Sequence, residues 1–276
     1  MDFNYDEVMR VVEEDRLSGF PDELIHKIFS CFDMKFVVQT CFLSSRWKLL
    51  WTSMPYLNFS TDRFPDLQKF DEFAAHVLSH RNHQSEVSSE KAFDIITPRL
   101  SNLTFIDDDY ISKSTVNVIA PQLENLTIIR CNIKYINAPL GLSSFCYRSR
   151  SWPIGVPQFT NDPFHSLNKV TIGLYFSWSP YMEELARETI SMLQKLHSAR
   201  HVTLDWEVAE CISSFPDLLS HHPSPFSNLI CLTIDCSRRN NVAYEVKIST
   251  EAKNFFLGNS PNATFIMEVP EVHLSE

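Results

Sequence analysis

The sequence predicts a chain of the mixed α+β or α/β class, in which a three-helix unit is followed by a short solenoid with a face of parallel strands. Two observations lead to this prediction. A dense apolar stretch between residues 15 and 60 has the spacing of amphipathic helices. A short apolar pattern then occurs six times between residues 100 and 234, and repeats at intervals of roughly 20–50 residues are typical of solenoids.

The first helix is predicted to start at Pro21, because proline suits the first helical position. Asp22 and Glu23 follow in the first turn, where carboxylates oppose the helix dipole. A short second helix is expected over the apolar run 36–42, and a third is expected to begin near Ser44, a good N-cap residue. Of the 45 residues from 15 to 59, 23 are apolar, which is more than so short a unit can bury alone. We therefore expect the rest of the chain or another protein to cover the surplus.

Two motifs carry the strongest signal in this stretch. The first is Leu17-x-x-Phe20-Pro21-Asp22-Glu23-Leu24-Ile25-x-x-Ile28, and the second is Leu43-Ser44-x-Arg46-Trp47-x-x-Leu50-Trp51. Together they resemble the F-box of plant F-box/leucine-rich-repeat proteins. The F-box is known as the segment that docks on the Skp-family linker subunit of SCF-type (cullin–RING) ubiquitin ligases.

The resemblance implies which residues would dock on the linker subunit. It implies helix-in-groove recognition, with apolar anchors and one charged residue, Arg46, that fixes the register. The implied docking residues are Leu17, Phe20, Pro21, Leu24, Ile25, Ile28, Leu43, Arg46, Trp47, Leu50 and Trp51.

Composition argues against several classes of function. The net charge is −10 and no basic block occurs, so we expect no nucleic-acid binding through phosphates. The three-helix unit could imitate a DNA-reading helix-turn-helix, but its third helix offers only Arg46 and Lys48. No run of 18 apolar residues occurs, so we expect no transmembrane helix and no membrane partner.

The expected location is inside the cell, in the nucleus, the cytoplasm or both. The acidic N-terminus lacks the apolar core of a secretory signal. The seven cysteines are scattered and form no C-x-x-C pair, so they are predicted to be reduced thiols.

A further helix is predicted from residue 67 to about 82, followed by a strand over 92–96. The helix resembles the linker helix that follows the F-box in the same family. His76, His80 and His83 have a spacing that can hold zinc. However, no nearby cysteine or acidic pair completes such a site, and histidine is favourable at a helix C-terminus. We therefore predict no metal and no other cofactor.

The repeat has the form apolar-x-x-apolar-x-apolar. Its start-to-start spacings of 23, 19, 25, 32 and 30 residues match irregular leucine-rich repeats of about 20–29 residues, two of them enlarged by inserted helices. Five copies carry threonine at the fifth position, where a strand residue between two inward-facing neighbours points outward. The copies begin at Leu100, Leu123, Leu142, Leu167, Ala199 and Leu229, and the threonines are Thr104, Thr127, Thr171, Thr203 and Thr233.

Other segments are expected between and after the repeats. These are outer-face helices at 181–196 and 208–219, an irregular loop at 149–163, a helix at 250–258 closed by glycine, and a capping strand at 262–269. The predicted division is a 1–14 acidic N-terminal tail, a 15–60 F-box, a 61–95 linker helix and first strand, 96–249 leucine-rich repeats, and a 250–276 C-terminal capping helix and strand.

Catalytic motifs are missing from the sequence. The chain has five glycines and no Gly-rich phosphate loop, no G-x-S-x-G and no H-E-x-x-H motif. The pair at 221–222 is expected to be surface histidine, and the run 107–109 is expected to be a solvated acidic turn. We therefore predict a chain that is not an enzyme.

The sequence predicts a substrate-recognition adaptor of an SCF-type E3 ubiquitin ligase, whose chemistry belongs to other subunits. The F-box would dock on the Skp-family linker and through it on cullin, and the strand face would bind an unknown protein client. The predicted client-binding residues flank the fifth position of the repeat and are Asn102, Ile106, Asn125, Ile129, Arg148, Lys169, His201, Asp205 and Asp235.

Two alternatives remain. One is an F-box/leucine-rich-repeat scaffold that never joins a ligase, which departures from the usual F-box at Ser45 and at 31–33 permit. The other is an enzyme with an unrecognised site in the repeat region.

Overall fold

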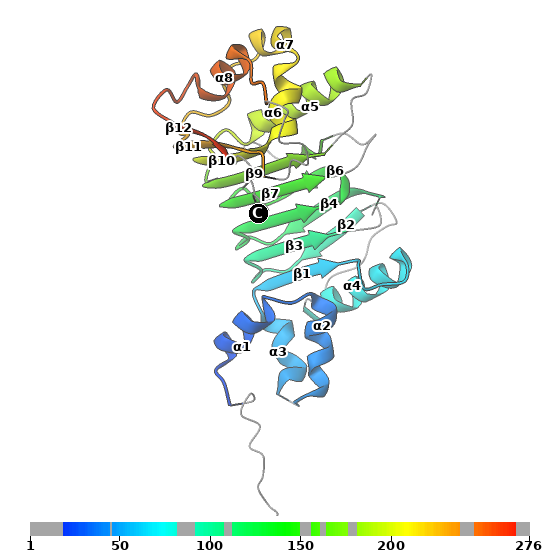
Figure 1. Ribbon diagram of the computed structural model, residues 1–276. Coiled ribbons are helices and arrows are strands. Elements are labelled where there is room, and N and C mark those ends of the chain that lie inside the picture. The colour runs from blue at the N-terminus through cyan, green and yellow to red at the C-terminus, as the bar shows by residue number, and fades with distance from the viewer. Residues whose placement is uncertain are drawn as a thin grey trace, which may run out of the picture.

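The computed structural model describes residues 19–44, 46–81, 92–107, 112–149, 156–160, 164–175, 181–237 and 246–268. Figure 1 shows a helical region at one end, stacked parallel strands in the middle, and further helices at the other end. The predicted mixed α/β class is confirmed. No helix in this part of the chain is long and apolar enough to cross a membrane.

The helical region comprises α1 (Asp22–Phe29), α2 (Met34–Gln39), the short 3-10 helix η2 (Thr40–Phe42) and α3 (Trp47–Ser53). Asp33 caps α2 by accepting a hydrogen bond from the Phe36 amide at 3.0 Å. α3 begins at Trp47 and not directly after Ser44, because the chain first makes a turn in which the Trp47 amide donates to the Ser44 carbonyl at 3.2 Å. Inside this region Phe29 and Trp47 meet edge to face at 5.5 Å.

Eight parallel strands form the larger sheet, in the order β1-β3-β5-β7-β9-β10-β11-β12. Each of the six repeat copies supplies one strand, from β3 to β11. The bounds are β1 (Tyr56–Ser60), β3 (Asn102–Ile106), β5 (Asn125–Ile129), β7 (Ser144–Ser149), β9 (Lys169–Leu174), β10 (His201–Asp205), β11 (Cys231–Asp235) and β12 (Thr264–Glu268). The predicted parallel sheet is confirmed.

The repeat register runs straight across this sheet. Thr104 lies opposite Thr127, while Thr203 lies opposite both Thr171 and Thr233. These threonines are half-exposed, and the apolar residues on either side of each are buried. Because a slip of one residue would turn the apolar set outward, this row fixes which side of the sheet faces solvent. We call that side the strand face.

A second sheet of four parallel strands, in the order β2-β4-β6-β8, was not predicted as a sheet. The sequence indicates β2 (Ala92–Ile96) but not β4 (Ser112–Ile119), β6 (Asn132–Asn137) or β8 (Gln158–Phe159). The prediction of an irregular loop over 149–163 is wrong at β8, where Phe159 lies opposite Ile136. Phe159 also packs edge to face on Phe145 of β7 at 5.1 Å, so side chains from both sheets share one core.

Helices take the place of the second sheet behind the last strands. They are α5 (Met182–Lys195), α6 (Trp206–Ser213), α7 (Pro216–Ser220) and α8 (Thr250–Leu257). They agree with the predicted helices at 181–196, 208–219 and 250–258, including the break before Pro216. Gly258 ends α8 in a right-handed conformation, with a φ of −56°. A Cβ there would lie 2.6 Å from the Asn254 carbonyl oxygen, so close approach, and not left-handed geometry, requires the glycine.

Helix α4 (Leu67–Arg81) joins the helical region to the sheet. Arg81 donates hydrogen bonds to the Trp51 carbonyl at 2.8 Å and to the Met54 carbonyl. Burial lowers the pKa of Arg81 to about 10. The predicted F-box ends at residue 60. Its last residues, Tyr56–Ser60, already belong to the sheet, because they form a strand paired with β3.

Candidate functional site

The helical region exposes an unusual amount of apolar surface. Among the described residues, seventeen large hydrophobic side chains are exposed, and eight of them fall between residues 20 and 49. Phe42, Leu43 and Leu49 are 93%, 68% and 71% exposed. Exposed apolar side chains gathered in this way mark interaction surfaces. We call this set the apolar patch; it consists of Phe20, Leu24, Ile28, Phe32, Phe36, Phe42, Leu43 and Leu49.

Helix α1 shows how the patch arises. Leu24 and Ile28 are four residues apart and share one face, where they are 43% and 38% exposed. Ile25 and Phe29 share the adjacent face, about 100° further around the helix, and are each 1% exposed. The helix therefore buries one apolar face in its own chain and presents a second one outward.

The strand face carries the nine predicted client-binding residues in two rows. The first row lies at the starts of the strands and contains Asn102, Asn125, Lys169 and His201. The side-chain amide of Asn125 donates a hydrogen bond to the side-chain oxygen of Asn102, 2.6 Å away. The second row lies at the strand ends and contains Ile106, Ile129, Arg148, Asp205 and Asp235. All nine are half-exposed or exposed.

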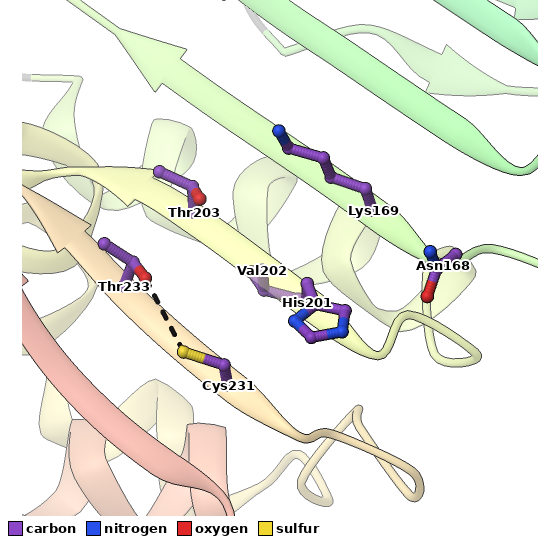
Figure 2. A pocket seen from close by; sticks show the side chains of 7 residues that line it. All are labelled: Asn168, Lys169, His201, Val202, Thr203, Cys231 and Thr233. Atoms are coloured by element: carbon purple, nitrogen blue, oxygen red, sulfur yellow. Dashed lines mark hydrogen bonds between the residues drawn. The ribbon is translucent and has the colours of Figure 1, made fainter.

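A shallow hollow of about 350 Å³ lies at the first row. Figure 2 shows Lys169 and His201 on neighbouring strands, with Thr203 and Thr233 further along the strand face. Cys231 forms a hydrogen-bond contact of 3.7 Å with the Thr233 hydroxyl. This hollow offers cationic and hydroxyl groups but no carboxylate among its lining residues.

The second row opens into a larger cavity of about 550 Å³ at the carboxyl edge of the sheet. Arg148 of β7 extends across β9 and makes ion pairs with Asp205 at 3.4 Å and Asp235 at 3.2 Å. Gly173 lies opposite Arg148 on β9, and a Cβ there would be 2.2 Å from the Asp205 Oδ2 atom. The glycine thus makes room for the ion pairs. This carboxyl-edge cavity is lined by Ile129, Arg130, Arg148, Ser149, Gly173, Tyr175, Asp205, Trp206, Glu207 and Asp235.

Glu207 is the titratable group most affected by this cavity. Burial raises the pKa of its carboxyl to about 7, and the carboxylates of Asp205, Glu210 and Asp235 act in the same direction. The sequence pattern of the repeat did not single out Glu207, Tyr175 or Trp206, because they follow the strands and lie outside the repeated positions.

Part of the chain is similar to known proteins. A model of the F-box domain matches residues 17–59. Two F-box/FBD/LRR-repeat proteins of Arabidopsis thaliana are similar: one is 37% identical over 81 residues, 28% of this chain and 18% of that protein. The other is 43% identical over 65 residues, 24% of this chain and 14% of that protein.

Residues 17–59 therefore match the F-box domain, and this part of the chain is similar to F-box/FBD/LRR-repeat proteins of a plant. A further F-box protein of the same plant is 29% identical over 99 residues, 36% of this chain and a quarter of that protein (25%). These matches span at most about a quarter of the relatives' own length.

The structure divides the predicted docking residues of the F-box. Phe20, Pro21, Leu24, Ile28, Leu43 and Arg46 are exposed, whereas Ile25, Trp47, Leu50 and Trp51 are 1–8% exposed. These four buried side chains pack inside the helical region and hold its helices together. Leu17 lies outside the described residues. Arg46 forms an ion pair with Asp22 at the start of α1, which ties the two motifs of the F-box to each other.

Four residues of the apolar patch were not predicted, namely Phe32, Phe36, Phe42 and Leu49. Phe32 and Phe36 are four residues apart and stack at 4.7 Å. That spacing is visible in the sequence and could have identified the pair as one unit. The exposure of Phe42 and Leu49 depends on how η2 and α3 turn, which the sequence pattern does not show.

Two other predictions concern ionisable clusters. His76 and His80 lie close, with ring centroids 4.2 Å apart, but His83 is outside the described residues. Where the structure describes side chains, no three His, Cys, Asp or Glu residues gather as metal ligands. The prediction of a solvated turn at 107–109 is wrong for Asp107, which is fully buried and accepts a hydrogen bond from the Thr61 hydroxyl at 2.7 Å.

Proposed function

We propose that the protein is a substrate-recognition adaptor of an SCF-type ubiquitin ligase. The F-box would dock on the Skp-family linker subunit and through it on cullin, and the sheet would bind a protein client. In this arrangement the chain itself carries no ubiquitin-transfer chemistry, which belongs to other subunits.

The apolar patch is the observation that carries this proposal. Leu24, Ile28 and Leu43 are F-box positions implied to contact the linker, and all three remain exposed in the free chain. Burying such anchors is what stabilises helix-in-groove complexes. The remaining docking contacts are assigned to Phe20, Pro21 and Arg46, while the buried Ile25, Trp47, Leu50 and Trp51 keep the exposed anchors in place.

We further propose that the larger sheet is the concave face of an irregular leucine-rich-repeat solenoid. Its parallel strands in register and its alternating burial support this. Arg81, hydrogen-bonded to two carbonyls at the end of α3, would hold this client-binding part at a fixed orientation relative to the F-box.

The inferred location is inside the cell, in the nucleus, the cytoplasm or both. None of the seven cysteines forms a disulfide in the described structure, as expected for a reducing compartment.

The decisive experiment is co-purification of the tagged chain with a Skp-type linker and cullin. Leu24→Asp should abolish capture of both, because it places a charge on the docking face. Leu140→Asp is the matched control: Leu140 is 42% exposed, against 43% for Leu24, and lies outside the F-box. Equal capture by the two variants contradicts the docking role. A wild-type chain that captures the linker but no cullin would favour the scaffold alternative, which the departures at 31–33 and Ser45 permit.

A further inference from the structure

The carboxyl-edge cavity has carboxylates and aromatic rings that suit a cationic group. An inference from this cavity about the client rests on the proposed function, because it names the chemical group that the client would offer. Its walls hold the carboxylates of Asp205, Glu207 and Asp235 against the guanidinium groups of Arg130 and Arg148. Arg148 already faces two of these carboxylates. Arg130 lies 3.9 Å from a further carboxylate, Asp62. When Glu207 is ionised, three carboxylates face two guanidinium groups in the cavity lining.

Two aromatic side chains line the same cavity. Tyr175 follows β9 and is 64% exposed, and Trp206 begins α6 directly after β10. An aromatic face attracts a lysine or arginine side chain through its quadrupole, most strongly where the cation is partly desolvated. Carboxylates and aromatic rings on one cavity wall favour the same kind of ligand group.

The position of the cavity suits a protein segment. It lies at the carboxyl ends of five neighbouring strands, β5, β7, β9, β10 and β11, the edge at which open parallel sheets commonly bind ligands. Lys169 and His201 of the first row lie at the opposite ends of two of the same strands, β9 and β10. His201 and Asp205 begin and end the same strand, so they are about 13 Å apart at roughly 3.3 Å per residue.

We propose that the carboxyl-edge cavity binds a lysine or arginine side chain of the client, held between the carboxylates of Asp205, Glu207 and Asp235 and the rings of Tyr175 and Trp206. The opposite end of the strand face, at Lys169 and His201, complements an acidic group of the same segment. The client motif is thus a basic residue and an acidic residue separated by about four positions of extended chain.

The probe for the experiment is a blocked peptide, Ser-Gly-Arg-Gly-Ser, with citrulline and glutamate analogues at the central position. Binding to the isolated full chain is followed by NMR or calorimetry, so no linker subunit is needed. If the arginine peptide does not bind while the chain still captures the linker, the inference is overturned and the proposed function is left intact. The arginine peptide should bind at least about fivefold tighter than the citrulline peptide, since only the charge differs.

Variants locate the binding. Asp235→Asn and Glu207→Gln should each weaken the arginine peptide about fivefold or more, and Tyr175→Leu about two- to fivefold. Glu124→Gln removes an exposed carboxylate outside the cavity and should leave the affinity unchanged. Thermal unfolding of each variant checks that the fold is kept.

The pH dependence provides an independent measurement. Burial raises the pKa of Glu207 to about 7, and the carboxylates of Asp205 of β10, Glu210 of α6 and Asp235 of β11 act in the same direction; Arg148 of β7 lines the same cavity. Affinity for the arginine peptide should rise roughly three- to tenfold from pH 6 to 8 as Glu207 ionises, and Glu207→Gln should remove that rise. Equal binding of the arginine and citrulline peptides, stronger binding of the glutamate peptide, or occupation by a second copy in light scattering would each overturn the proposal.

Discussion

Alanine substitution of two adjacent α1 residues should separate docking from folding. Ile25 is 1% exposed and Leu24 is 43% exposed. Ile25→Ala should lower the free energy of unfolding by about 2–5 kcal/mol, the range for a deleted core side chain. Leu24→Ala should lower it by about 1 kcal/mol or less, because much of that side chain is already in water.

The affinity for the linker should depend more on the exposed Leu24 than on the buried Ile25. Full burial of a leucine or isoleucine is worth about 1.5–3 kcal/mol, and the exposed fractions of Leu24, Ile28 and Leu43 are 43%, 38% and 68%. Covering what remains exposed on these three is thus worth roughly 2–4 kcal/mol. The triple alanine variant should therefore bind the linker about 30- to 1,000-fold more weakly.

Urea denaturation measures the first quantity, and calorimetry with a purified Skp-type linker measures the second. A triple variant that unfolds as easily as Ile25→Ala would show that the patch is part of the core. A triple variant that keeps wild-type affinity would show that the patch does not dock. Either result refutes the reasoning.

Three further predictions concern the sheet. Glu207→Gln should raise the free energy of unfolding by about 1–2 kcal/mol at pH 8, after discounting for partial exposure. Because the pKa of Glu207 is raised to about 7, the wild type loses stability as the pH rises from 4.5 through 7. Denaturation curves should therefore show that the advantage of the variant over the wild type vanishes near pH 4. Thr61→Val should cost about 1–3 kcal/mol by removing a donor to the buried Asp107, and an unchanged midpoint would contradict this. Gly173→Ala should cost about 1–3 kcal/mol, since its Cβ would displace Asp205 and Arg148; a crystal structure of the variant with both ion pairs intact would count against that explanation.

The sequence predicted the elements whose pattern is strictly local. The apolar-x-x-apolar-x-apolar copies became strands β3 to β11 because alternation of buried and outward residues is a property of a single strand. Helices α4, α5 and α8 were likewise predicted within a few residues, since an amphipathic stripe and capping residues such as Ser249 act over one turn. Strands β4, β6 and β8 escaped, because their own sequences are partly polar and do not carry the repeated pattern.

The sequence by itself determined that residues 17–59 match the F-box, roughly where helices form in this stretch, and which residues share the strand face. It did not separate the buried Trp47 and Trp51 from the exposed Leu43 and Leu49. Apolar character is a property of each residue, whereas burial depends on which neighbouring element packs against it. Tertiary structure alone decided that Arg148 reaches across Gly173 to two aspartates, because that contact joins strands up to 87 positions apart in the chain.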